Sequence, residues 1–63
     1  MHHEKIPVFY WWKAANKEFY WHLKAPNGKI VCQSEGYKRK AGCLNGIRAV
    51  QAYAGLADIL NRD

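Results

Sequence analysis

The run Lys38-Arg39-Lys40 is the clearest candidate binding site in this sequence. Three consecutive cations directly before a predicted helix would lie beside backbone N–H groups that have no acceptor within the helix. That combination binds anions such as a phosphate or a carboxylate. The alternative interpretation is a solvated charge run, because most runs of like charge only keep a surface hydrated.

Aromatic side chains interleaved with lysines form the second candidate site, and they are concentrated between residues 9 and 24. Alternation along an extended chain places either Phe9 and Trp11, or Tyr10 and Trp12, on the side that a packed helix would cover. The pair on the other side would remain exposed. Exposed Trp and Tyr rings either form a subunit interface or stack on nucleic-acid bases.

Residues for catalysis or metal binding do not form a recognisable set. The two cysteines lack zinc-ligand spacing, and the three histidines lack the spacing of a metal site. We therefore predict no enzyme activity, no metal, no cofactor and no small-molecule substrate. The side chains that could act as nucleophiles, bases, acids or metal ligands are Cys32, Cys43, His2, His3, His22, Glu4, Glu18, Glu35, Asp58 and Asp63.

Length and charge set the remaining bounds. A chain of 63 residues with a formal net charge of +5 is one domain, residues 1–63, with residues 1–6 predicted as a frayed terminus. A domain this small is marginally stable alone, so a partner subunit is expected. Without a signal peptide or a membrane-spanning run, we expect a cytoplasmic protein. The positive charge favours an acidic partner, either protein or nucleic acid.

Hydrophobic periodicity gives the elements that position these residues. Periods of two predict strands at residues 7–13, 18–25 and 29–34, and a helical period predicts a helix at 39–54. Asn27-Gly28 predicts a two-residue type I′ hairpin turn. That turn would pair Ala25 with Ile30 and Leu23 with Cys32. The segment from Leu56 to Leu60 is expected to be a further helical turn or a short strand, and its apolar side chains are an alternative to the aromatic residues as the homodimer interface.

One apolar sheet face against one helix stripe makes a two-layer α+β domain with a three-stranded antiparallel sheet and one C-terminal helix, in the order βββα. Gly46, within the helix, would let the backbone approach the sheet closely. Cys43 is also expected at a buried position. The predicted core consists of Trp21, Leu23, Ile30, Cys32, Ile47 and Val50.

The segment Trp21–Tyr37, with its Leu-Lys-Ala, Asn-Gly and Ser-Glu motifs, resembles the YegP-like family, and the match continues over Ala41–Val50 around Gly46-Ile47. The resemblance implies a βββα unit that occurs as a tandem pair or as a homodimer, with Phe9 and Trp11 on the helix-facing side. It implies no active site. Relatives often carry Ser or Thr just after the tyrosine, where this chain has the basic run.

With Phe9 and Trp11 facing the helix, the other sheet face is expected to carry an interface candidate set, joined by Lys13. The set is Tyr10, Trp12, Tyr20, His22 and Lys24. Two functional hypotheses follow. The first is a non-catalytic interaction module that acts through protein–protein contacts as a homodimer. The second is a DNA- or RNA-binding module that uses the basic helix start and the aromatic and lysine sheet face.

Overall fold

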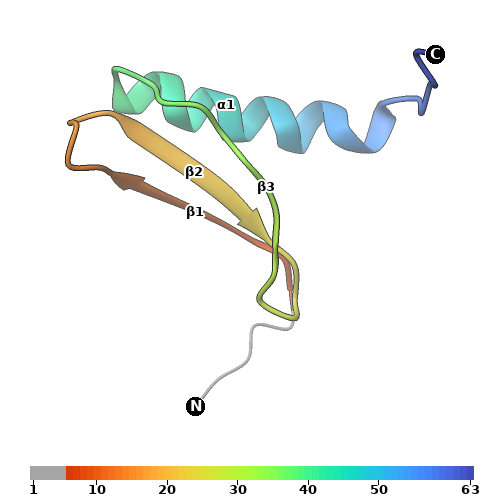
Figure 1. Ribbon diagram of the computed structural model, residues 1–63, viewed down its shortest axis with the longest axis horizontal. Coiled ribbons are helices and arrows are strands. Elements are labelled where there is room, and N and C mark those ends of the chain that lie inside the picture. The colour runs from red at the N-terminus through yellow and green to blue at the C-terminus, as the bar shows by residue number, and fades with distance from the viewer. Residues whose placement is uncertain (1–5) are drawn as a thin grey trace.

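The structure is a computed structural model that describes residues 6–63. Three strands, β1 (Val8–Lys13), β2 (Phe19–Lys24) and β3 (Ile30–Gln33), precede one helix, α1 (Lys40–Tyr53), and a short 3₁₀ turn, η1 (Ala54–Leu56) (Figure 1). The strands form one antiparallel sheet in the order β1-β2-β3. The predicted α+β fold is confirmed. The predicted frayed terminus lies outside the described residues except for Ile6, which is exposed.

The first hairpin pairs the strands in a regular register, with Trp11 opposite Trp21 and Tyr10 opposite His22. Its loop spans residues 14–18, and the backbone N–H of Ala14 donates to the carbonyl oxygen of Glu18 at 2.8 Å. Lys17 closes the loop with φ at 68°. Phe9 packs against the buried core, so the helix-facing side of β1 is the one that the family resemblance implied.

The second hairpin does not use the predicted type I′ turn. The N–H of Gly28 donates to the carbonyl of Ala25, and that of Ala25 to Lys29, so the loop has three residues. Gly28 has a φ of 87°, and no positive φ occurs at Asn27. Pro26 explains the difference, because its fixed negative φ suits the second position of a type I turn. Gly28 then takes the left-handed conformation.

A β-bulge follows this turn and changes what the sequence predicted for β3. Lys24 pairs with Ile30, and the register shifts before Leu23 pairs with Cys32 as predicted. The predicted pairing of Ala25 with Ile30 is therefore wrong. Because paired residues share a face, Ile30 lies on the face of Lys24, away from the helix, and is 52% exposed.

The core lies where α1 crosses β2. Trp21, Cys43 and Ile47 are buried, and five partly buried hydrophobic residues pack around them: Phe9, Phe19, Tyr37, Leu44 and Val50. A Cβ atom at Gly46 would collide with the hydroxyl of Tyr37 and lie 3.2 Å from Nε1 of Trp21. The close approach predicted at Gly46 is confirmed, and it draws the first half of α1 onto the sheet.

The second half of α1 extends past the sheet, and its distance from the strands grows toward the C-terminus (Figure 1). Leu23 is consequently only half-buried, and its partner Cys32 is exposed. The predicted core positions of Ile30 and Cys32 are thus wrong, the first because of the bulge and the second because the helix does not cover that end of the sheet. After η1, residues 57–63 form no helix or strand, so the helical turn or short strand predicted from Leu56 to Leu60 is wrong beyond Leu56.

Candidate binding surfaces

The sheet face opposite α1 carries the outer aromatic surface, defined as Tyr10, Trp12, Tyr20, His22 and Lys24. The structure brings all five residues together. The Trp12 ring is stacked on Tyr20 at 6.0 Å between centroids and lies 5.0 Å from the His22 ring. The Tyr10 ring lies edge-on to His22, and the Lys24 ammonium is 5.5 Å from the Tyr10 centroid. The rings thus pack mainly against one another.

The basic run lies at the start of α1, as predicted. Arg39 is the N-cap residue, with extended backbone angles and no side-chain capping hydrogen bond, and the first helical turn contains no acidic residue. A cation at this end of a helix is unfavourable with respect to the macrodipole. The first turn therefore combines positive side chains with N–H groups that have no side-chain acceptor.

Lys40 points back to the sheet rather than away from it, because its Nζ atom lies 5.1 Å from the centroid of the Trp11 ring. Trp11 is 41% exposed, although it shares the helix-facing side with Phe9. Its ring contacts Phe19 at 6.3 Å between centroids. The backbone of Tyr37 is paired with Phe19 by two hydrogen bonds, which holds the basic run beside this end of β2.

Lys13 belongs to the same cluster. It was expected on the outer face, but it pairs with Phe19 and its Nζ atom lies 5.8 Å from the Phe19 ring. Strand alternation places it with Trp11, two residues earlier. We name the set Trp11, Lys13, Lys38, Arg39 and Lys40 the basic patch. The sequence predicted that the helix covers Trp11 and did not predict its exposure.

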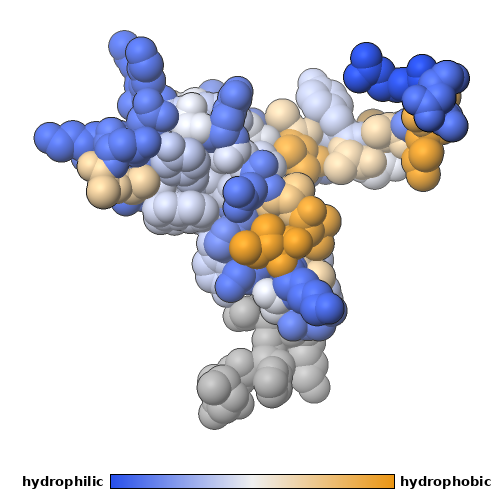
Figure 2. Space-filling view, in the orientation of Figure 1, coloured by the Kyte–Doolittle hydropathy of each residue, from blue (hydrophilic) through white to orange (hydrophobic). Residues whose placement is uncertain are grey.

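Figure 2 shows hydrophilic side chains gathered over the helix start.

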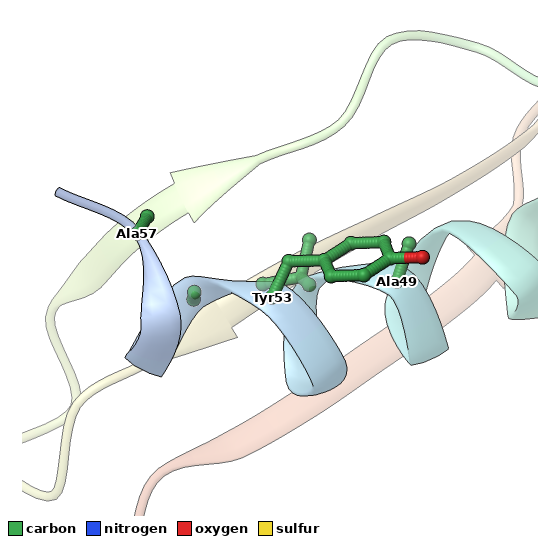
Figure 3. Close-up of a pocket in the computed structure, with 5 residues that line it drawn as sticks. Ala49, Tyr53 and Ala57 are labelled. Carbon is green, nitrogen blue, oxygen red and sulfur yellow. The ribbon is translucent and has the colours of Figure 1, made fainter.

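The third surface is apolar and follows the second half of α1. A hollow of about 300 Å³ is lined by Ala49, Val50, Tyr53, Ala54 and Ala57. The Tyr53 ring lies along the helix toward Ala49, and its side chain is 69% exposed (Figure 3). Leu56, Ile59 and Leu60 follow with exposures of 81%, 100% and 82%. Figure 2 shows hydrophobic surface on this C-terminal part and over β3.

The thiols and histidine do not form a reactive site among residues 6–63. Burial raises the pKa of the Cys43 thiol, which keeps it protonated and poorly nucleophilic. Cys32 is opposite Leu23, whereas His22 lies on the other face of the sheet. No group of three His, Cys, Asp or Glu residues in this range could hold a metal ion. In the same range, no helix has the length and apolar character to cross a membrane.

Comparisons with known proteins agree with the resemblance seen in the sequence. A UPF0339 protein in the ptx operon 5′ region of Stutzerimonas stutzeri is 54% identical over 37 residues, which are 59% of this chain and 33% of that protein. The UPF0339 protein YegP of Yersinia pestis is 48% identical over 40 residues, covering 64% and 36%. The match thus spans about a third of these relatives.

A UPF0339 protein of Treponema denticola matches over more of its length, with 42% identity over 43 residues that cover 68% of this chain and 74% of that protein. The fold is similar to the NMR solution structure of the protein from Haloferax volcanii. The TM-score is 0.78 at 29% identity, covering 90% of this chain and 97% of that one. The family model for a domain of unknown function, DUF1508, matches residues 14–60, and the chain therefore belongs to the DUF1508 family.

Proposed function

We propose that this chain is a non-catalytic interaction module whose first partner is a second copy of itself. The observation that carries the proposal is the apolar surface at the end of α1. Leu56, Ile59 and Leu60 are almost fully exposed and directly follow an apolar hollow that lies along the second half of α1. In the homodimer, these side chains of one copy pack against the uncovered helix and sheet end of the other.

Burial in the single chain supports the proposal. Only Trp21, Cys43 and Ile47 form the buried hydrophobic core among residues 6–63. Fully burying a Leu or Ile side chain contributes about 1.5–3 kcal/mol, so the three C-terminal side chains offer a gain comparable with the marginal stability of a small domain. A second copy also covers Leu23 and Cys32, at the sheet end that α1 leaves open.

The lengths of the relatives are compatible with a paired unit. The matched segment occupies 74% of the Treponema denticola protein but only 33% of the Stutzerimonas stutzeri protein. The longer protein has room for a second unit within one chain. A single unit achieves the same packing by associating with another copy.

The non-catalytic part of the proposal rests on the placement of the reactive groups. The buried Cys43 thiol has a raised pKa, and the His22 ring is held between Tyr10 and Trp12 on the opposite face from Cys32. A nucleophile and a base must lie within hydrogen-bonding reach of one another. These groups do not, so we assign the chain a binding role.

Sedimentation equilibrium of the full chain at micromolar concentration tests the homodimer. We expect twice the 7.3 kDa mass of the chain. The double variant Ile59→Ser/Leu60→Ser should sediment as a monomer, because it removes two exposed apolar side chains. The matched control is Trp12→Ser, on the outer aromatic surface, which should remain dimeric.

The same experiment separates the alternatives. A wild-type chain that sediments as a monomer at every concentration would refute the proposal. Dissociation by Trp12→Ser, with Ile59→Ser/Leu60→Ser still dimeric, would move the interface to the outer aromatic surface and show that the C-terminal packing is wrong.

A further inference from the structure

We propose that the basic patch binds single-stranded nucleic acid, with one base stacked on Trp11 and the flanking phosphates held by Lys13, Lys38, Arg39 and Lys40. The proposal does not depend on the homodimer, because the basic patch lies at the start of α1 and the proposed subunit contacts lie at its end.

The Trp11 ring is the proposed stacking platform. Its side chain is on the helix-facing side of β1 but remains 41% exposed. The helix packs on β2, the central strand, and its first residue, Lys40, places its Nζ atom 5.1 Å from the centroid of the Trp11 ring. Phe19 supports the ring from within the sheet at an interplanar angle of 43°. A rigidly supported, exposed indole is a platform on which any base can stack.

Positively charged side chains lie at the Trp11–Phe19 ring pair. Lys40 places its ammonium group over the Trp11 ring and Lys13 places its own over Phe19, while Lys38 and Arg39 directly precede Lys40 in the chain and are exposed. Within residues 6–63, none of these four side chains is paired with a carboxylate. The first turn of α1 contains no acidic residue. Two cations at the Trp11–Phe19 ring pair, with two more directly before Lys40 in the chain, suit the alternation of phosphates and bases along a single strand.

The outer aromatic surface has more rings but is less suited to this ligand. Trp12 is stacked on Tyr20 and tilted against His22, so one of its faces is covered by another ring, whereas Trp11 meets the Phe19 ring at a tilt of 43°. Lys24 is the cation in contact with them, and it lies over Tyr10. A duplex is also unsuited to the basic patch, because its bases are already stacked and cannot reach the indole. The geometry therefore favours a single strand at Trp11.

Fluorescence anisotropy with labelled oligothymidine and oligouridine, titrated with the full chain, tests the proposal. We expect binding at low salt that weakens steeply as salt increases, because each neutralised phosphate releases counterions. A duplex of equal length should bind more weakly. The absence of binding to both single strands at low salt, or a preference for the duplex, would overturn the proposal.

Adjacent tryptophans on opposite faces provide a matched pair of variants. Trp11→Leu should reduce the affinity about tenfold, consistent with the loss of one stacked base. Trp11→Tyr retains a stacking ring and should bind within about threefold of the wild type. Trp12, which is 39% exposed, is the control, and Trp12→Leu should leave the affinity unchanged. If Trp12→Leu weakens binding and Trp11→Leu does not, the assignment to the basic patch is wrong.

Charge variants test the contribution of the cations to binding, and heparin, a polyanion without bases, tests the contribution of base stacking. Lys38→Gln/Lys40→Gln should lower the slope of log affinity against log salt by about two, whereas Lys24→Gln/Lys29→Gln should not. Circular dichroism of each variant should match that of the wild type, which separates a loss of binding from a loss of folding. Heparin should compete only weakly with the single strands, and its affinity should not change in the Trp11→Leu variant. If heparin binds as tightly as the single strands and Trp11→Leu affects neither, the patch is a general polyanion surface and the stacking proposal fails.

Discussion

At the scale of single residues, the two cysteines lie in opposite environments. Cys43 is completely buried between α1 and the sheet, whereas Cys32 is exposed on β3. The sequence predicted both as small buried hydrophobic residues. Each cysteine fits the apolar periodicity of its own element equally well. Only the divergence of the helix from the sheet, which leaves Cys32 uncovered, distinguishes them.

The raised pKa of Cys43 predicts how stability depends on pH. The folded state holds the thiol proton more tightly than the unfolded state, whose ordinary thiol pKa is 9.0. This contribution is fully present below that value and is lost as the pH rises above it through the folded-state pKa. Urea unfolding should therefore show a falling free energy of unfolding above this pH.

Alanine variants isolate the effect. Cys43→Ala should remove this part of the alkaline loss of stability, whereas Cys32→Ala should retain it. A thiol reagent at neutral pH should modify Cys32 first, with Cys43 reacting only as the protein unfolds. Equal modification rates of both thiols in the folded protein would contradict the placement of Cys43.

At the scale of the elements, the order and type of the strands and helix were predictable because the hydrophobic period changes once, from two to the helical value. The turn between β2 and β3 was not, because Pro26 outweighs the preference of Asn27-Gly28 for a type I′ turn. The exposure of Trp11 could not be predicted from the sequence either. Strand alternation gives the face of a residue, but where a helix crosses that face depends on tertiary packing.

The two glycines of α1 provide a prediction at this scale. A methyl group at Gly42 would meet the Tyr37 ring at ordinary contact distance, 3.4 Å, but at Gly46 it would collide with the Tyr37 hydroxyl and lie tightly against Nε1 of Trp21, at 3.2 Å. Gly42→Ala should stabilise the domain by up to about 1 kcal/mol through helix propensity. Gly46→Ala should destabilise it by about 1–3 kcal/mol, because either the Tyr37 side chain or the helix must shift to relieve the collision.

Chemical denaturation of the two variants, compared with the wild type, measures both effects. Because each change is the same Gly-to-Ala replacement in the same helix, their difference reports packing alone. A stabilising Gly46→Ala variant would show that the helix does not depend on close contact at this position.

At the scale of the whole molecule, stability and association should be coupled if the C-terminal side chains are buried between two copies. Thermal unfolding should then shift to higher temperature as protein concentration rises, by mass action. Ile59→Ser/Leu60→Ser should melt lower and at a temperature independent of concentration. A wild-type midpoint that does not change with concentration would argue against the dimer.

The adjacent pair Trp11-Trp12 has a consequence for folding. A strand with one polar face resists slippage, because a shift by one residue would move its apolar side chains into water. In β1, with the sequence VFYWWK, large apolar rings occur on both faces. A one-residue slip would exchange Tyr10 and Trp12 for Phe9 and Trp11 at little hydrophobic cost. The alignment of β1 is therefore enforced by the loop at residues 14–18, where Lys17 adopts its left-handed conformation. A weakened loop would yield a misaligned hairpin that presents the wrong tryptophan to each surface.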